Sequence, residues 1–230
     1  MIQLTNGGCV MNYLVIIPAY NEEKNVPELI EKIKETGYDY LVINDCSTDN
    51  SSFVYEKLGI NYLDLPINMG LASVTQAGFR YAYEHNYDGA IVIDGDGQHP
   101  PKYIKTVLDE LDKGYNYVVG SRYLTQKKPW TLRMVGSRII CFFIYLKTGK
   151  KVTDPTSGMR AADKNIMKLF ADNMNYIAEP DAYADLIKRN FKTSEVQVSM
   201  EERDEGVSYF SSPFKSIRFV FNVLVSILFL

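Results

Sequence analysis

Histidine and cysteine are scarce in this 230-residue chain, which contains two of the former and three of the latter. The cysteines, Cys9, Cys46 and Cys141, lie far apart and form no Cys-x-x-Cys pair. This spacing argues against a disulfide framework and a zinc site, and it fits a reducing compartment. With so little histidine, neither a histidine-rich metal centre nor a Ser-His-Asp hydrolase is expected.

Other signals are missing as well. The formal net charge of −3 argues against a nucleic-acid partner, which would require a basic face. The first strand-to-helix junction lacks Gly-x-Gly-x-x-Gly, and no P-loop motif occurs, so a nicotinamide dehydrogenase and a P-loop NTPase are disfavoured. No internal run reaches the roughly 20 apolar residues that span a bilayer. Residues 1–12 lack the apolar core of a secretory signal and are predicted to be a disordered extension.

The first half of the chain alternates strand and helix patterns. Strands are predicted at 13–17, 40–43, 60–65, 90–93 and 117–119, and helices at 22–36, 51–58, 71–85 and 101–113. Pro18 is expected to end the first strand, and small residues in the 71–85 helix are expected to allow close packing. This order predicts an α/β domain whose mostly parallel sheet is covered on both faces.

After residue 120 the alternation ends. A turn-rich loop is predicted at 150–162, helices at 163–171 and 181–189, and a strand at 195–200. Apolar helices are predicted at 130–147 and 213–230, the second with a polar stripe of Lys215, Arg218, Asn222 and Ser226. Basic residues at its start are typical of helices at a membrane interface. The alternative is that both helices pack into the core, which is the commoner fate of amphipathic segments.

Two carboxylates follow the strand predicted at 90–93. Asp94 and Asp96, separated by one glycine, are therefore delivered to the carboxyl end of a strand, where open α/β sheets bind ligands. Two acids this close repel each other unless a cation or several donors lie between them. Oxygen ligands suit Mg²⁺ or Mn²⁺, which commonly bridge to a diphosphate. The alternative is a plain polar Asp-Gly turn.

The order of several short motifs is more specific than any one of them. The series resembles the family 2 glycosyltransferases of GT-A fold, and within them the branch of dolichyl-phosphate mannose synthase and other polyprenyl-phosphate glycosyltransferases. The resemblance covers about 13–212, which we treat as the catalytic domain, followed by a membrane-associating helix at 213–230. It rests on the segments 15–22, 42–49, 68–70, 94–100, 119–123, 154–160, 179–181 and 203–208.

The resemblance implies a nucleotide-sugar site formed by Pro18, Tyr20, Glu22, Asp45, Asp94 and Arg122. The first of these segments has a structural alternative, a strand-to-helix turn in which Asn21 caps the helix. The chain departs from the usual Asp-Asp-Gly-Ser pattern at Asn44 and Cys46, and this leaves the nucleotide base, uracil or guanine, undetermined.

The implied metal ligands for Mg²⁺ or Mn²⁺ are Asp94, Asp96 and Gln98, whereas His99 receives no role. Asp96, Asp154 and Arg203 are the implied catalytic residues. Arg122 and Arg203 are suited to phosphate because guanidinium groups pair with its oxygens. For Asp154 a general base facing the acceptor and a structural turn are weighed equally, because a phosphate acceptor is already a dianion at neutral pH.

The sequence thus predicts a metal-dependent inverting glycosyltransferase. The expected partners are a UDP- or GDP-linked sugar, a polyprenyl phosphate such as undecaprenyl or dolichyl phosphate, and the cytoplasmic face of the cell membrane, with a homo-oligomer left open. One alternative is a transferase that extends a saccharide or another hydroxyl acceptor. Another is a non-catalytic scaffold that binds nucleotide sugars, and a nucleotidyltransferase is disfavoured because a Gly-rich basic triphosphate loop is missing.

Overall fold

A computed structural model describes residues 11–172, 179–201 and 213–229. Its seven-stranded sheet has the order β3-β2-β1-β4-β6-β5-β7. The strands are β1 (Tyr13–Ala19), β2 (Asp39–Asn44), β3 (Tyr62–Asp64), β4 (Gly89–Val92), β5 (Tyr117–Ser121), β6 (Arg160–Asp163) and β7 (Thr193–Gln197). The helices are α1 (Asn25–Lys34), α2 (Ser51–Lys57), α3 (Leu71–Glu84), η1 (Pro101–Tyr103), α4 (Ile104–Asp112), α5 (Leu132–Thr148), α6 (Lys164–Asp172), α7 (Glu179–Lys188) and α8 (Pro213–Phe229).

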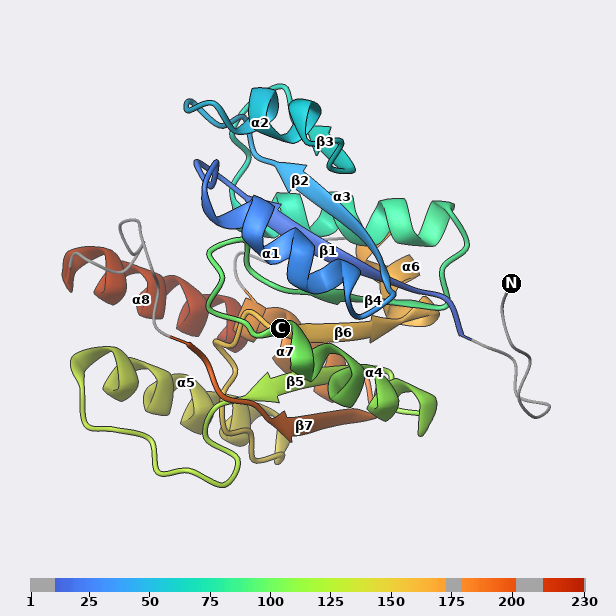
Figure 1. Ribbon diagram of the computed structural model, residues 1–230. Helices are drawn as coiled ribbons and strands as arrows, with labels where there is room; N and C mark the ends of the chain where they lie inside the picture. Colours follow the sequence, from blue (N-terminus) through green and yellow to red (C-terminus); the bar gives the residue numbers. More distant parts are fainter. Residues whose placement is uncertain (1–10, 173–178, 202–212, 230) are drawn as a thin grey trace.

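Helices cover both faces of the sheet, as predicted (Figure 1). The apolar faces of α1, α2 and α4 form one core with Val15 and Ile17 of β1. Helices α3, α5, α6, α7 and α8 form the other core with Leu14 and Ile16. Because side chains alternate along a strand, a central strand buried on both faces must be apolar throughout. This explains the unbroken apolar run of β1.

The prediction that Pro18 ends the first strand is wrong. β1 continues through Pro18 to Ala19, and Pro18 is in register with Ile43 of β2. Pairing with β4 stops at Ile16 and Val92, and the Pro18 carbonyl accepts a hydrogen bond from Gly95 N at 3.2 Å. The polar groups of Pro18 therefore face the side on which the β4 ladder has ended, where a missing N–H breaks no ladder bond.

The predicted loop at 150–162 is also wrong at its end, because Arg160–Asp163 forms β6. This strand lies antiparallel between β4 and β5, with Arg160 beside Val92 and Val119. Its four residues lack a strong strand preference, and pairing on both edges determines their conformation. Since β6 runs opposite to its neighbours, the segment that precedes it arrives at the edge of the sheet where β4 and β5 end.

Close packing of α3 on the sheet is confirmed. A methyl group at Gly78 would overlap the side chain of Ile16 and lie 3.1 Å from that of Ile43, and Ala82 is fully buried. Most other predicted elements are shifted only at their ends: α1 begins at Asn25 and β7 occupies 193–197.

Helices α5 and α8 lie side by side against α7 (Figure 1). Gly136 of α5 lets Val220 approach closely. Ser226 of α8 donates a 2.6 Å hydrogen bond to the buried Asp181 of α7, so this member of the predicted polar stripe faces the protein. Lys147 Nζ donates to the carbonyl of Leu228 at 2.8 Å. Among the described residues, no helix combines the length and hydropathy that crossing a bilayer requires.

Candidate active site

The predicted site residues gather where the strand order changes direction. β1 has β2 on one side and β4 on the other, and the crevice beyond such a switch point is where doubly wound sheets bind ligands. Tyr20 and Glu22 follow β1, and the turn from Asp94 to Pro100 follows β4. Arg122 follows β5, and the reversed direction of β6 brings the segment with Asp154 to the same edge.

The turn after β4 brings together three potential metal ligands. One ligand atom each from Asp94, Asp96 and His99 lies within 4.8 Å of the others. The His99 Nδ1 atom is 3.6 Å from Asp94 Oδ2, and both carboxylates are half-buried. The backbone N–H of Gln98 donates to Asp96 Oδ1 at 3.1 Å. Two carboxylates and an imidazole nitrogen at these separations fit a divalent cation, and Gln98 remains a predicted ligand.

His99 was not anticipated as part of this cluster. Its side chain is 1% exposed, and burial lowers its pKa while the charges of Asp94 and Asp96 oppose that shift. A neutral imidazole retains a lone pair on one nitrogen. Nε2 has no hydrogen-bond partner among the described residues. The sequence signal was only its adjacency to the acidic turn, because burial of a single histidine cannot be read from the chain.

Gly158 closes over this cluster. A Cβ atom there would overlap the carboxylate of Asp94 and lie 2.8 Å from Cε1 of His99. Only glycine at this position therefore allows the backbone of the loop before β6 to lie so close to the carboxylate. Gly158 was recognised as part of a motif, whereas its contact with Asp94 became visible only in the structure.

Asp45 organises a neighbouring loop. Its buried carboxylate accepts hydrogen bonds from the backbone N–H groups of Met69 at 2.7 Å and Gly70 at 2.9 Å. The amide of Asn68 donates to the Asp45 carbonyl at 3.1 Å. The resemblance assigns Asp45 to the nucleotide base. The structure gives its carboxylate two backbone donors, so the residue also shapes the loop that precedes α3.

The alternative that Asn21 caps a helix is wrong. Helix α1 begins at Asn25 and has no side-chain cap. Asn21 has a positive φ of 57°, and its Oδ1 accepts from Thr48 N at 2.8 Å and from Asp49 N at 3.3 Å. Its own N–H donates to Ser47 Oγ at 2.9 Å. These bonds join the loop after β1 to the loop after β2, so both sides of the predicted nucleotide site form one unit.

The other predicted nucleotide contacts differ in accessibility. Pro18 is buried within β1, whereas Tyr20 is 46% exposed and its ring is available for stacking. Glu22 is buried and accepts a 2.5 Å hydrogen bond from Asn25 Nδ2. Cys46, which departs from the family pattern, has φ of 56°, a left-handed conformation that favours glycine.

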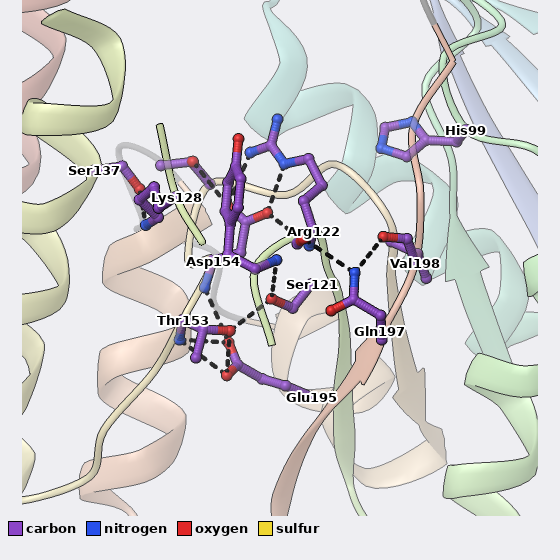
Figure 2. A network of polar contacts seen from close by, with 12 residues as sticks. His99, Ser121, Arg122, Lys128, Ser137, Thr153, Asp154, Glu195, Gln197 and Val198 are labelled. Carbon is purple, nitrogen blue, oxygen red and sulfur yellow. Dashed lines mark hydrogen bonds and ion pairs between the residues drawn. The ribbon is translucent and has the colours of Figure 1, made fainter. Parts of the chain in front are cut away.

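Arg122 and Asp154 form a two-pronged ion pair (Figure 2). Arg122 Nε lies 2.6 Å from Asp154 Oδ2 and Nη2 lies 2.8 Å from Oδ1, while Arg122 N donates to Oδ2 at 3.1 Å. Asp154 is completely buried. Burial lowers the pKa of Arg122, but the bonds and charge of Asp154 outweigh it and raise that pKa overall. Both carboxylate oxygens of Asp154 therefore bind Arg122 and orient its guanidinium.

No sequence pattern indicates a site role for Glu195 of β7. Its carboxylate accepts from the backbone of Thr153 and Asp154, beneath the ion pair (Figure 2). A single glutamate in a strand gives no signal of such a role, because its partners lie about 40 residues away. Arg203, one of the predicted catalytic residues, lies outside the described residues, and the side chain of Glu179 is likewise not described.

Comparison with known proteins identifies the class. The model of glycosyl transferase family 2 matches residues 14–170, and the chain belongs to this family. The polyprenol monophosphomannose synthase of Mycolicibacterium smegmatis is 28% identical, over 86% of this chain and 80% of its own length. The UDP-N-acetylglucosamine–dolichyl-phosphate N-acetylglucosaminyltransferase of Methanococcus voltae is 32% identical, over 70% of this chain and 72% of its own.

A solved structure shares the fold. Glucosyl-3-phosphoglycerate synthase from Mycobacterium tuberculosis, in complex with Mn²⁺, uridine-diphosphate-glucose and phosphoglyceric acid, superposes with a TM-score of 0.70. The sequences are 15% identical, and the match covers 95% of this chain and 80% of the other. This likeness confirms the predicted α/β fold of a GT-A glycosyltransferase, and the family match confirms the predicted enzyme class.

Proposed function

We propose that this glycosyltransferase transfers one sugar, with inversion, from a nucleotide sugar to a polyprenyl phosphate at the cytoplasmic face of the membrane. The product would serve the synthesis of a cell-surface polysaccharide or glycan. Both relatives described above are named for polyprenol or dolichyl-phosphate acceptors. The names of relatives do not show which acceptor this chain uses, so the acceptor class must be supported by residues of this chain.

The observation that carries the proposal is the outward apolar face of α5 and α8. On α8, Ile217 and Phe221 are exposed by 61% and 64%, while Ser226 faces Asp181. On α5, Phe142 and Leu146 are exposed to a similar extent. Both helices also bury an apolar face in the core, whereas the outer face of a helix at a water-facing surface is usually polar. Adjacent helices with outward apolar faces favour contact with a lipid surface.

The charges around these helices support the same conclusion. Neither the segment 114–153 nor the segment 213–230 contains an aspartate or glutamate, although the whole chain is acidic. Trp130, just before α5, is 84% exposed, and the Arg138 guanidinium lies 4.1 Å from its ring centroid. Such a mixture of tryptophan and basic residues is typical of the headgroup region. The basic residues of these segments are Arg122, Lys127, Lys128, Arg133, Arg138, Lys147, Lys150, Lys151, Lys215 and Arg218.

The turn after β4 is assigned to the donor. Asp94, Asp96 and the predicted ligand Gln98 would hold Mg²⁺ or Mn²⁺, with His99 beside them. When bound, the cation would neutralise charge on the departing nucleoside diphosphate. The exposed Tyr20 is assigned to stacking on the nucleotide base, and Glu22 and Asp45 are assigned to the nucleotide as well. Arg122 and Arg203 are assigned to phosphate oxygens.

A phosphate acceptor also agrees with the pairing of Asp154 with Arg122. The second pKa of a phosphate monoester is about 6, so the acceptor is largely a dianion at neutral pH and attacks without a general base. Asp154 then orients Arg122 and takes no proton. A hydroxyl acceptor would require a base, and the ion pair leaves Asp154 poorly suited to that task.

A panel assay tests the proposal. UDP- and GDP-linked sugars are each incubated with the protein, Mg²⁺ or Mn²⁺, and either a polyprenyl phosphate in detergent or water-soluble saccharides. We expect a glycosylated polyprenyl phosphate with at least one donor. Transfer only to saccharides would contradict the acceptor class. Tight donor binding with neither transfer nor donor hydrolysis would support the non-catalytic scaffold.

A further inference from the structure

β7 carries a row of side chains that bind other parts of the site. It pairs with β5 at the end of the sheet order. Thr193, Glu195 and Gln197 alternate along the strand and therefore point to the same face. Thr193 accepts from Lys150 Nζ at 2.6 Å through both its carbonyl and its hydroxyl. The next two residues of this row contact the loops that carry the ion pair (Figure 2).

Glu195 holds the segment that contains Asp154. Its Oε2 accepts from Thr153 N and Thr153 Oγ1, both at 2.9 Å. Its Oε1 accepts from Thr153 N at 3.0 Å and from Asp154 N at 3.2 Å. The Thr153 hydroxyl is also 2.6 Å from Ser121 Oγ. One carboxylate thus satisfies two consecutive backbone N–H groups and a hydroxyl, which fixes the direction in which Asp154 leaves the backbone.

Gln197 holds the segment that contains Arg122. Its Nε2 donates to the Arg122 carbonyl at 3.0 Å. Its Oε1 accepts from Thr125 N at 2.8 Å and from Thr125 Oγ1 at 2.9 Å. The backbone of Arg122 is therefore fixed from β7, while its guanidinium is fixed by Asp154. Neither half of the ion pair depends only on its own loop.

We propose that Glu195 and Gln197 are positioning residues that hold the Arg122 guanidinium toward a phosphate of the reactants. This inference rests on the proposed function for the identity of those phosphates. A guanidinium has five N–H donors, and Asp154 takes two of them, so three are not engaged by Asp154. Burial of Asp154 and the bonds from β7 fix the plane of the guanidinium, and with it the directions of these three donors. A preorganised donor stabilises phosphate charge without reorganising first.

Two sources of that phosphate are distinguishable by kinetics. If Arg122 binds the acceptor monophosphate, Glu195→Ala raises the KM for the acceptor and leaves the donor KM unchanged. If it binds the donor diphosphate, the donor KM rises instead. We expect an increase of about 10- to 100-fold in one of the two, as is typical when a supporting partner of a site residue is removed. Glu195→Gln keeps one acceptor oxygen for the two backbone N–H groups and should restore most of the loss.

A measurement without substrate tests the positioning role of Glu195 and Gln197 separately from the proposed function. The Nε–H signal of Arg122 is followed by ¹H–¹⁵N NMR, with Arg122→Lys used to assign it. We expect slow exchange with water in the wild type, much faster exchange in Glu195→Ala and Gln197→Ala, and near-recovery in Glu195→Gln. Ser194→Ala is the matched control, because this neighbouring side chain points the other way and donates to Glu110 at 3.1 Å.

The possible outcomes distinguish the positioning role of β7 from the proposed function. An unchanged Arg122 signal in Glu195→Ala, with both KM values unchanged, overturns the positioning role. An equal change in Ser194→Ala also overturns it, because any disturbance of β7 would then suffice. If the wild type transfers no sugar to polyprenyl phosphate, the proposed function fails, and the NMR comparison still decides the role of Glu195.

Discussion

Two carboxylates of the candidate site, Asp94 and Asp154, have different surroundings. Asp94, in the turn after β4, is half-buried beside an imidazole whose pKa is lowered by burial. Asp154, before β6, is fully buried and paired with Arg122. The charge of Asp154 is thus used inside the protein, whereas the turn after β4 retains negative charge that a cation from outside can neutralise. The same type of side chain is available to a ligand in one place and holds an arginine in the other.

The largest expected effect comes from Asp96→Asn. The change keeps the shape of the side chain but removes charge from the metal turn, so sugar transfer should be lost while the fold persists. Transfer is measured across a titration of Mn²⁺, and folding by circular dichroism. If Asp96→Asn transferred sugar at the wild-type rate at every metal concentration, Asp96 would not be a metal ligand.

Gly158→Ala should disturb the same turn without changing any charge. The added methyl group overlaps the Asp94 carboxylate, so this ligand must rotate away. We expect Mn²⁺ affinity, measured by electron paramagnetic resonance, to fall about 10- to 100-fold. Ser157→Ala, at the adjacent buried position, serves as the control. Equal affinities for both variants would show that the position of Asp94 does not matter to the metal.

Comparing Asp154→Asn with Asp94→Asn tests the contrast directly. Removing Asp154's charge leaves the mostly buried Arg122 without its partner, so the free energy of unfolding should fall by about 3 kcal/mol. Asp94→Asn removes a charge with no arginine or lysine within ion-pair distance among the described residues, so its stability should be equal to or above that of the wild type. Urea denaturation measures both. Equal losses of stability in the two variants would contradict the idea that only Asp154 stabilises the fold through its charge.

The face proposed to contact lipid should respond to a double change, Ile217→Ser with Phe221→Ser. Because both residues are exposed, stability should remain near that of the wild type. Binding to anionic vesicles, measured by sedimentation, should weaken at least about 10-fold, since apolar area would no longer enter the interface. Leu63→Ser is the control, because Leu63 is an exposed apolar residue on β3, outside α8. Undiminished vesicle binding by the double variant would argue against a membrane role for α8.

The smallest effect is expected at Cys46. Its φ of 56° strains a residue with a Cβ, so Cys46→Gly should stabilise the protein by about 0.5–1 kcal/mol after the entropy of glycine is deducted. Cys46→Ala keeps the strain and should give no gain, which makes it the control in thermal unfolding. A gain in both variants would place the cause in the thiol and not in the backbone.

Sequence patterns predicted the elements whose side chains determine their own conformation. Apolar strands such as β1 and β4, and the small residues that bring α3 close to the sheet, were of this kind. β6 was missed because its conformation depends on two neighbouring strands, and Pro18 was misread because its effect depends on where β4 ends. In the site, the acidic turn was readable because Asp94 and Asp96 are close in sequence. Burial of His99 and the pairing of Arg122 with Asp154, 32 residues away, required the folded chain.

Two hydrogen bonds near the end of α8 restrict how the helix can move. Ser226 binds α7 and the Leu228 carbonyl binds Lys147 of α5, so α8 cannot roll about its axis without breaking both. The apolar face of the helix therefore keeps a fixed angle to the cleft. If that face rests on a bilayer, the height of Arg122 above the lipid headgroups is fixed as well. A lipid phosphate must then rise to that height to react, and this requirement would select acceptors by reach as well as by chemistry.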